Sequence, residues 1–328
     1  MSFPIFLKPV FQERIWGGNR LKKQFHYPIP SEKTGECWAI SAHPHGQSIV
    51  KKGPYQGKTL QELWENHQEL FGNRQEKTFP LLTKLIDASK DLSVQVHPDE
   101  EYAHYHEHGE HGKTECWYIV DCKEDAEIIL GHKAKSKDEL KAMIKENRWD
   151  DLLQRIPVKP GDFFYIPSGT IHALGAGILV LETQQSSDVT YRLYDYNRTD
   201  QNGQKRELHL EKALDVIQVP HQLEPVEPRI IQQKNAVFTT FLQCEWFTVE
   251  KWEINGTVLI PPTENFLLVS VICGQGQIRI NQQTDPLQKG DHFILPCRME
   301  EFELSGKFTL IVSQPASLVV NHVPKSSG

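Results

Sequence analysis

The sequence predicts a mainly β fold in which two similar β-barrels are accompanied by a smaller set of covering helices. Short runs rich in β-branched and aromatic residues, bounded by Gly, Pro or Asp, recur along the chain, which is typical of a barrel or a sandwich. The stretch KPGDFFYIP at residues 159–167 returns as KGDHFILP at residues 289–296, which indicates a repeated unit. Helical patterns are fewer and local.

Six runs have the length and composition of strands, and three longer stretches have helical spacing of their apolar residues. The predicted strands are 114–120, 161–167, 177–184, 266–272, 276–280 and 308–313. The predicted helices are 58–72, 136–153 and 207–219. Thr59 with Glu62 and Ser136 with Glu139 form capping-box patterns at the start of the first two helices. These helices are expected to cover the barrels.

The two copies of the repeated unit differ after their shared strand. The first copy continues as SGTIHAL, which places His172 eleven residues after Gly161. In the second copy, the residue eleven positions after Gly290 is Glu301, and Arg298 replaces the turn glycine. Only the first barrel is therefore expected to hold a metal.

This difference predicts a division of the chain into three segments. Residues 1–236 are expected to form a metal-binding catalytic domain that carries the helices as insertions. Residues 237–316 are expected to form a second, degenerate barrel without metal, and residues 317–328 a flexible tail.

Composition excludes several classes of protein. The net charge of the 328 residues is -7 and no Lys/Arg-rich block occurs, which argues against a nucleic-acid or anionic-membrane partner. The N-terminus lacks the apolar region of a signal peptide and no stretch approaches eighteen apolar residues, so a cytoplasmic location is expected. The six cysteines form no C-x-x-C pair, which indicates neither a disulfide framework nor a zinc finger. The oligomeric state is left open, and a monomer is compatible with the sequence.

The stretch SVQVHPDE at residues 93–100 has the alternation of a short strand. Val94 and Val96 would share one face, while Gln95 and His97 share the other. A single histidine in this setting is more often a hydrogen-bonded core or loop residue than a metal ligand. Its assignment depends on the rest of the chain.

Two motifs indicate a family. GDFFYIPSGTIHAL resembles the second cupin motif, G-x5-P-x-G-x2-H, whose histidine binds a metal inside a small jelly-roll barrel. The usual HxH form of the first cupin motif is absent, but VQVHPDE followed by GKTECWY resembles the variant found in type I phosphomannose isomerases. The similarity extends over nearly the whole chain and resembles the short bacterial form of the family. Further stretches that carry it are PVFQERIWGG (9–18), GECWAISAHP (35–44), FPLLTKLIDASKDLSVQVHPDE (79–100) and LETQQSSDVTYRLYDYNR (181–198).

The resemblance implies a metal site inside the first of two cupin-like β-barrels. Its ligands would be His97, Glu115 and His172, which can converge because interior side chains alternate along barrel strands. Gln95 would be a fourth ligand by resemblance alone. Nitrogen and oxygen donors on a rigid frame suit zinc, so one Zn²⁺ per chain is expected.

Five further residues are assigned to the site. Lys113 and Arg192 match a lysine and an arginine of the family's active site. Asp188 alternates with Arg192 in SDVTYR, so the two would share a face if this segment were a strand. Lys84 and Ser93 match positions that contact the sugar or its phosphate in relatives.

The resemblance implies an isomerase that interconverts mannose 6-phosphate and fructose 6-phosphate through an enediol or enediolate. Such a reaction needs a base and a group that stabilises negative charge on oxygen, for which a divalent metal and Arg192 are suited. The base is left open between Lys113, Asp188 and a metal-bound water. Two alternatives are a redox cupin such as a dioxygenase, and a sugar-binding cupin without catalytic activity.

Overall fold

The structure is a computed structural model that describes residues 3–199 and 203–316. The predicted tail, residues 317–328, lies outside the described residues. The helices are α1 (Arg20–Phe25), α2 (Leu60–Asn66), the 3₁₀ helix η1 (Gln68–Phe71), α3 (Glu100–His106), α4 (Lys137–Lys145), α5 (Trp149–Leu152) and α6 (Leu210–Val216). The strands are β1 (Ile5–Lys8), β2 (Val10–Gly18), β3 (Thr34–Ile40), β4 (Ile49–Val50), β5 (Leu81–Ala88), β6 (Val94–Val96), β7 (Glu115–Cys122), β8 (Glu127–His132), β9 (Leu153–Pro157), β10 (Phe163–Ile166), β11 (His172–Leu174), β12 (Ile178–Gln185), β13 (Tyr191–Tyr194), β14 (Arg229–Gln233), β15 (Ala236–Gln243), β16 (Phe247–Ile260), β17 (Leu267–Ile280), β18 (Gln283–Gln288), β19 (His292–Leu295) and β20 (Phe302–Pro315).

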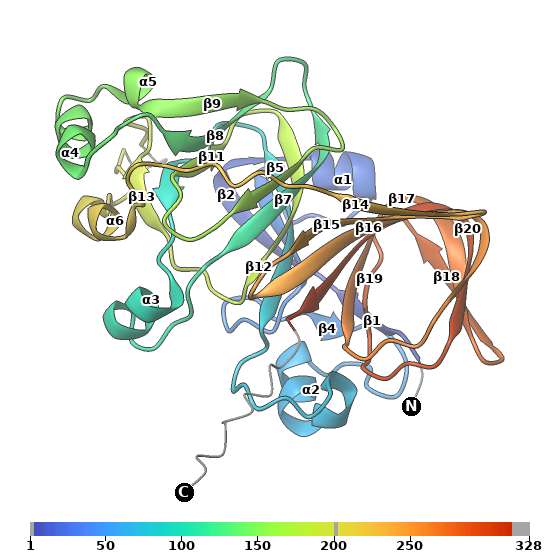
Figure 1. The fold of residues 1–328 in the computed structure, drawn as a ribbon. Coiled ribbons are helices and arrows are strands. Elements are labelled where there is room, and N and C mark those ends of the chain that lie inside the picture. The colour runs from blue at the N-terminus through green and yellow to red at the C-terminus, as the bar shows by residue number, and fades with distance from the viewer. Residues whose placement is uncertain (1–2, 200–202, 317–328) are drawn as a thin grey trace, which may run out of the picture.

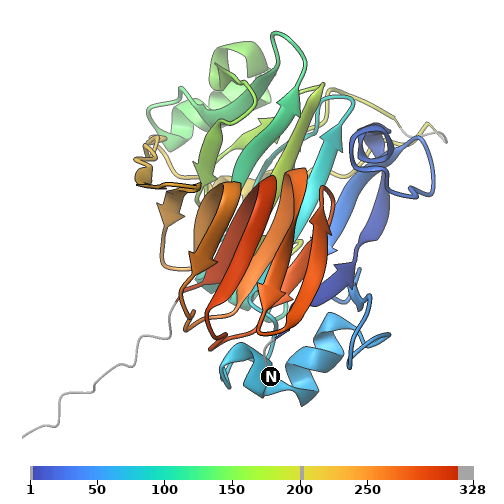
Figure 2. The same cartoon turned by 90° about the vertical axis from the view of Figure 1, so that its right-hand side faces the viewer.

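The strands form three antiparallel sheets, and the six-stranded sheet lies between the other two (Figures 1 and 2). Its order is β10-β7-β12-β5-β3-β2, and the five-stranded sheet has the order β13-β6-β11-β8-β9. Val180 on one face of β12 shares an apolar cluster with Leu130 of the five-stranded sheet. Leu181 on the other face shares a cluster with Ile311 of the nine-stranded sheet. Both faces of β12 are therefore covered, which explains why every residue of this strand is buried.

The nine-stranded sheet curls around a core of its own (Figure 1). Its main path is β14-β15-β16-β20-β17-β19-β1-β4, with β18 paired to β17. Gly276 lies opposite Gly306 in the pairing of β17 with β20. A Cβ atom at Gly306 would lie 2.5 Å from the Cα of Gly276, so glycine permits this close approach.

The mainly β, cupin-like architecture is confirmed, with one correction. None of the three sheets closes on itself within the described residues, so the predicted barrels are pairs of facing sheets and a curled sheet rather than closed barrels. The nine-stranded sheet also takes β1 and β4 from the N-terminal part of the chain, through pairing of β1 with β19. The sheet boundary therefore does not follow the predicted division at residue 236.

The predicted helices are present but shorter. The capping box at Thr59 is formed, yet α2 ends before His67 and continues as the 3₁₀ helix. The stretch 136–153 is interrupted at Asn147, whose φ of 57° is left-handed, and its end joins β9. Helix α3 was not predicted; Asp99 caps it by accepting a hydrogen bond from the Tyr102 amide. No described helix is long and apolar enough to cross a membrane.

The predicted strands are all present, with 266–272 and 276–280 joined in β17. The repeat is also visible in the backbone, because Gly169 and Arg298 both adopt left-handed φ values, of 82° and 53°. The second copy thus keeps the turn without the glycine. Glu301, at the position that corresponds to His172, is exposed, whereas His172 is buried.

Candidate active site

Two rows of side chains face each other between the six-stranded and the five-stranded sheets. Opposite residues in antiparallel strands share a face, so the pairings of Lys84 with Trp38, of Glu182 with Lys84 and of Glu182 with Trp117 form one row. Glu115 lies on the same face, two residues before Trp117.

The five-stranded sheet contributes the second row. Gln95 of β6 pairs with Arg192 of β13 on one side and with His172 of β11 on the other. His97 follows directly after β6, so it stands on the same face as Gln95. The predicted alternation of SVQVHPDE therefore corresponds to the observed strand and the residue after it.

The structure brings His97, Glu115 and His172 together. Their candidate ligand atoms all lie within 4.8 Å of one another, and the three side chains are fully or almost fully buried. Glu115 Oε2 lies 3.5 Å from His97 Nε2, and Glu115 Oε1 lies 3.4 Å from His172 Nε2. This spacing is compatible with three ligands of one ion, because donors about 2.1 Å from a tetrahedral zinc are roughly 3.4 Å apart.

The hydrogen bonds of the two imidazoles fit a metal. His97 Nδ1 lies 2.8 Å from the Val189 carbonyl oxygen, and His172 Nδ1 lies 2.9 Å from the Thr170 carbonyl oxygen. A carbonyl only accepts, so both Nδ1 atoms donate and both Nε2 atoms keep a lone pair, next to the Glu115 carboxylate. Burial lowers the pKa of His97 to about 3 and also lowers the pKa of His172, which keeps both rings neutral.

Glu115 has the remaining property that a metal ligand requires. Although burial would raise its pKa, the Lys113 ammonium holds the pKa of Glu115 well below its usual range. Among the described residues, its Oε1 atom has no hydrogen-bond partner. A buried, ionised carboxylate with an unpaired oxygen between two imidazole lone pairs is a donor set that fits zinc.

Gln95 lies beside this cluster. Its Nε2 atom is 3.2 Å from His172 Nε2, so its amide contacts the cluster through nitrogen. A ligand role would require the amide to turn so that its oxygen faces the ion. The part of Gln95 as a fourth ligand therefore stays a prediction.

Lys113 reaches the same cluster from the start of β7. Its ammonium contacts Glu115 Oε2 and lies 3.0 Å from His97 Nε2. Burial would lower its pKa, but Glu115 and Glu182 raise the pKa of Lys113 above its ordinary value. In the protein alone, this ammonium therefore supplies a counter-charge for the buried carboxylate.

A cavity of about 400 Å³ opens in front of the cluster. Of the residues that the sequence singled out, Lys84, Ser93, Gln95, Lys113, Asp188 and Arg192 line it. The metal-ligand candidates lie directly behind Gln95 and Lys113. Basic side chains outnumber acidic ones in the lining, which makes the cavity suited to an anion in an acidic protein.

Lys84 and Glu182 form the centre of the row on the six-stranded sheet. Lys84 donates a 2.8 Å hydrogen bond to Gln184 Oε1, and its Nζ atom lies 3.5 Å from Glu182 Oε1. Trp117 Nε1 donates to the other oxygen of Glu182 at 2.9 Å. Burial and the nearby Glu115 raise the pKa of Glu182, so a proton can reside on this carboxyl more readily than on an exposed one.

Arg192 lies on the opposite wall. Its Nε donates to Ser93 Oγ at 3.2 Å, and its Nη1 donates to the Glu207 carbonyl oxygen at 2.9 Å. In the described part of the chain it forms no ion pair, whereas Arg206 is paired with both oxygens of Asp195. Arg192 is thus a guanidinium whose charge is not matched by a contacting carboxylate.

Asp188 faces the cavity but is held by a histidine. Its Oδ2 atom lies 2.6 Å from His45 Nδ1, and its Oδ1 atom lies 3.7 Å from His43 Nε2. The prediction that one strand carries both Asp188 and Arg192 is wrong, because β13 begins only at Tyr191. Both side chains nevertheless line the cavity. Burial would raise the pKa of Asp188, but His45 and His43 lower it.

His43, His45 and Asp188 also lie close enough to suggest a metal cluster. The hydrogen bonds argue against this. His43 Nδ1 accepts from the His45 amide at 3.3 Å, so in the neutral ring Nε2 carries the hydrogen and points it at Asp188. This arrangement is the reverse of that in His97 and His172.

Several pocket residues were missed from the sequence. Glu182 is the one charged residue of β12, and an isolated charge in a buried strand is a signal that could have revealed it. Glu36 accepts from both Arg14 and Trp38 and also lines the cavity. His43 gave no usable signal, since its contacts with Asp188 span distant parts of the chain.

Comparison with known proteins agrees with this geometry. The model of the type I phosphomannose isomerase catalytic domain matches residues 5–119, and the model of the mannose-6-phosphate isomerase cupin domain matches residues 237–315. The chain is 55% identical to the mannose-6-phosphate isomerase ManA of Bacillus subtilis strain 168 over 310 residues, which cover 94% of this chain and 98% of that protein. It is 52% identical to the mannose-6-phosphate isomerase of Streptococcus mutans over 313 residues, or 95% of this chain and 98% of that protein.

Solved structures show the same relationship. The crystal structure of the mannose 6-phosphate isomerase from Bacillus subtilis has a TM-score of 0.94 and 57% identity, and the match covers 95% of this chain and 99% of that one. A variant of phosphomannose isomerase from Salmonella typhimurium has a TM-score of 0.77 at 14% identity, covering 97% of this chain and 100% of that one, which shows a shared fold. From the sequence identity over nearly its whole length, the chain belongs to the type I phosphomannose isomerase family.

Proposed function

We propose that this chain is a metal-dependent isomerase that interconverts mannose 6-phosphate and fructose 6-phosphate. The observation that carries the proposal is the convergence of His97, Glu115 and His172 behind a cavity that also presents Arg192 and Lys113. The relatives named above are mannose-6-phosphate isomerases, and they match over nearly the full length of the chain.

The cavity suits a phosphorylated hexose in length and charge. Ser93 lies two residues before Gln95 on the β6 segment, which corresponds to about 6.6 Å along a strand. Arg192 contacts Ser93 and lies opposite Gln95 in the pairing of β13 with β6, so a cationic side chain borders the cavity beside the ligand cluster. Guanidinium and hydroxyl donors are common partners of phosphate and sugar oxygens. Ser93, Lys84 and Arg192 are accordingly proposed to contact substrate.

The metal is proposed to be one zinc ion per chain. His97, Glu115 and His172 would hold it, with Gln95 as a fourth ligand. The donor set of two imidazole nitrogens and one carboxylate is typical of zinc sites that keep a position open. When bound, a divalent ion would act as a Lewis acid that stabilises negative charge on the sugar oxygens.

The residues of the chain divide the remaining work between the two walls. Arg192, from the five-stranded sheet, stabilises the enediolate by hydrogen bonds to its oxygens. Lys113 and Glu182, on the side of the six-stranded sheet, are placed to hold or transfer the proton that moves between C2 and C1. Asp188 is the weaker candidate for this step, because its carboxylate is engaged by His45.

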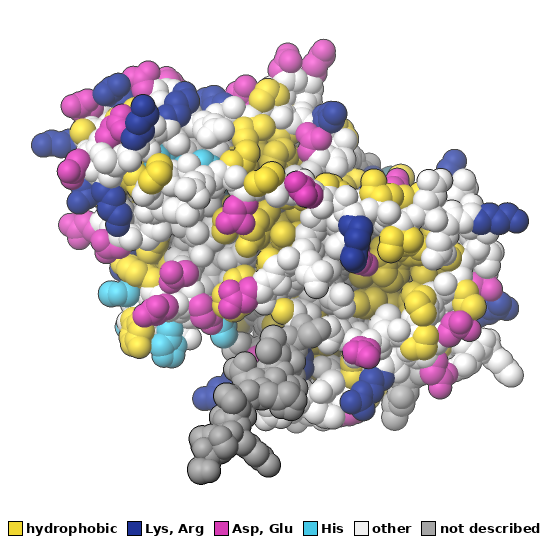
Figure 3. Space-filling view, viewed as in Figure 1, with side chains coloured by type: hydrophobic (Ala, Val, Ile, Leu, Met, Phe, Trp, Pro, Cys, Tyr) yellow, Lys and Arg dark blue, Asp and Glu magenta, His cyan; other side chains and the backbone are white. Residues whose placement is uncertain are grey.

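The wider assignments follow from the same features. Residues 1–236 are proposed to carry the catalysis and residues 237–316 to bind no metal. A cytoplasmic location is proposed, and the net charge of -7 argues against nucleic-acid and anionic-membrane partners. On the face shown in Figure 3, Lys and Arg side chains are interspersed with Asp and Glu, without one basic patch.

The test is an anaerobic isomerase assay on mannose 6-phosphate combined with metal analysis of the purified protein. Fructose 6-phosphate should form without oxygen, and removal of the metal by a chelator should abolish the activity. Glu182→Gln should retain the metal and lose about a hundredfold or more in kcat, as expected for a proton-transfer group. Oxygen-dependent turnover would instead favour a dioxygenase, and binding without turnover would favour a sugar-binding protein.

A further inference from the structure

The backbone on both sides of Lys113 is held by two side chains from other elements. Glu100 Oε2 accepts a 2.9 Å hydrogen bond from the Gly112 amide, and Gln185 Oε1 accepts a 2.9 Å hydrogen bond from the Thr114 amide. Gln185 Nε2 donates to Glu100 Oε2 at 3.0 Å, which joins the two. The amide of Lys113 itself donates to the Pro98 carbonyl oxygen at 3.0 Å. Three consecutive amides are therefore fixed.

Glu100 and Gln185 are themselves well anchored. Glu100 is the first residue of α3, where the helix N-terminus favours a carboxylate, and Asp99 caps this helix. Gln185 is the last residue of β12, and its backbone amide donates to the Thr114 carbonyl oxygen at 3.1 Å. Gln185 is buried and Glu100 is half-buried, so neither is a loose surface group.

The chain approaches Lys113 in close contact with α3. A Cβ atom on Gly112 would overlap the backbone of Asp99 and Glu100, so the segment fits there only with glycine. His111 is not among the residues that line the cavity of about 400 Å³. Its Nδ1 atom lies 2.7 Å from Glu100 Oε1 and its Nε2 atom 2.6 Å from Thr78 Oγ1. Glu100 therefore organises the approach to Lys113 as well as its anchoring.

We propose that Glu100 and Gln185 form a clamp that positions Lys113 against His97 and Glu115, and that they are positioning residues for the isomerase reaction. The inference rests on the proposed function, because it assumes that Lys113 takes part in that reaction. Lys113 Nζ is at hydrogen-bond distance from His97 Nε2 only if the backbone that carries it stays in register with Pro98.

Loss of the clamp would act through geometry. Without Gln185, the Thr114 amide loses its side-chain acceptor and Glu100 loses one donor. The segment from Gly112 to Thr114 could then shift relative to the ligand cluster. A displacement of about 1 Å in a catalytic group is enough to lower a rate strongly. Substrate binding through Arg192 and Ser93, on the other wall, should change little.

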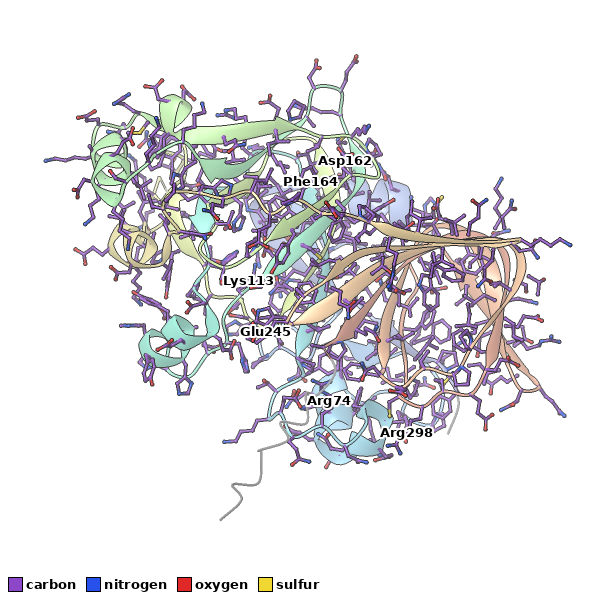
Figure 4. The ribbon with its side chains drawn as sticks, in the orientation of Figure 1. Arg74, Lys113, Asp162, Phe164, Glu245 and Arg298 are labelled. Atoms are coloured by element: carbon purple, nitrogen blue, oxygen red, sulfur yellow. The ribbon has the colours of Figure 1, made fainter. Side chains whose placement is uncertain are left out.

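Steady-state kinetics on the full-length, metal-loaded protein test the clamp. Gln185→Met and Glu100→Ala should each lower kcat about tenfold or more, with KM within about twofold and one metal retained. Glu100→Gln should recover most of the activity, because its amide oxygen can still accept from the Gly112 amide. Glu245→Ala is the matched control. Glu245, labelled below Lys113 in Figure 4, lines the same cavity of about 290 Å³ as Glu100, but the Gly112 and Thr114 amides donate to Glu100 and Gln185 instead.

Amide hydrogen exchange provides a readout that does not depend on activity. The amides of Gly112 and Thr114 should exchange faster in Gln185→Met and Glu100→Ala than in the wild type and in Glu245→Ala. Unchanged kcat and unchanged exchange in both clamp variants would overturn the proposal, as would equal losses in Glu100→Ala and Glu100→Gln. A wild type without isomerase activity would instead refute the proposed function, while the exchange measurement would still decide whether the clamp holds the segment.

Discussion

Both halves of the molecule bury histidines among strands, but the two settings give the imidazole different chemistry. His97 and His172 each donate from Nδ1 to a backbone carbonyl and direct Nε2 toward a carboxylate. His292, in the nine-stranded sheet, has Nδ1 2.8 Å from Ser270 Oγ and Nε2 2.7 Å from Tyr27 OH. Both of its nitrogens contact hydroxyl groups, and no carboxylate of the described residues groups with it as Glu115 groups with His97 and His172.

Burial is therefore not the property that distinguishes a metal ligand in this fold. His292 is as buried as His97, and burial lowers the pKa of both to about 3. What differs is the neighbour, which is a carboxylate with an unpaired oxygen in the first case and a pair of hydroxyls in the second. A buried histidine in this fold is therefore not by itself evidence of a metal site.

Cavity size is an equally poor guide. The nine-stranded sheet borders a cavity of about 820 Å³, twice the size of the one beside the ligand cluster. Its charged lining consists of Lys51, Lys52, Lys307 and Asp291, and none of the residues assigned to catalysis or metal binding reaches it. The convergence of polar side chains, rather than the volume of a cavity, therefore indicates the candidate active site.

The largest effect is expected from the ligands. His97→Ala, Glu115→Ala and His172→Ala should each lose the bound metal and lower isomerase activity by more than about a hundredfold, the loss that even neighbours of ligands can cause. His292→Ala is the matched change in the other sheet, and it should retain one metal per chain. Metal analysis and activity of the four purified variants decide this. Stoichiometric metal in all three ligand variants would remove the distinction drawn between the two histidine settings.

Arg192 should have the next largest effect, because it is a guanidinium in the cavity that forms no ion pair with any described residue. If it stabilises the enediolate, Arg192→Ala should lower kcat about a hundredfold to a thousandfold, equivalent to roughly 3 to 4 kcal/mol, with a smaller change in KM. Arg192→Lys should rescue poorly, since an ammonium lacks the planar fork of the guanidinium. Steady-state rates with metal content checked are the measurement. A change confined to KM would make Arg192 a binding residue, and full activity would exclude it from the site.

The pH dependence of stability is a third property in which the setting of His292 can be tested. Burial holds the pKa of His292 at about 3 against an ordinary value of 6.5, so below pH 6.5 the unfolded chain binds a proton that the folded chain does not. The contribution of His292 to the free energy of unfolding is thus fully present above pH 6.5 and is lost as pH falls toward 3.

Denaturant unfolding of metal-saturated protein between pH 7 and pH 4.5 measures this effect. The free energy of unfolding of His292→Gln should fall less steeply with decreasing pH than that of the wild type, by up to about 1.4 kcal/mol per pH unit. Parallel slopes would show that His292 is not neutral in the folded protein.

Local patterns predicted the parts of the fold and site that depend on nearby residues. The alternation around Val94 and Val96 placed Gln95 and His97 on one face, and the Gly-turn motif singled out His172, which the structure places at the start of β11. The joining of these residues with Glu115 in one cluster came from the family resemblance, which carries the barrel geometry that no local pattern contains.

What the sequence did not reveal depends on long-range pairing. The pairing of β1 with β19 joins segments almost 290 residues apart, and no local signal marks it. Helix α3 was missed because its stretch is rich in Glu and His and lacks apolar periodicity, so its Asp99 cap and its contacts decide its structure. His45 became relevant only through Asp188, which lies 143 residues further along the chain.

The smallest effect is expected at Glu301, the residue of the second barrel that corresponds to His172. Glu301 is exposed, and Arg298 before it keeps the left-handed backbone of the turn. The second repeat therefore keeps the backbone of the first, but the residue that corresponds to His172 faces solvent. Glu301→Ala should therefore leave the metal content at one per chain, kcat unchanged and the free energy of unfolding within about 0.5 kcal/mol of the wild type, as for most surface substitutions.

Glu301→His is the sharper variant, because it restores the ligand type at the repeated position. No second ion should bind, since His292, the histidine of residues 237–316, has both nitrogens engaged by hydroxyl groups. Binding of a second zinc by Glu301→His, or loss of metal in Glu301→Ala, would show that the two barrels differ less than their hydrogen bonds indicate.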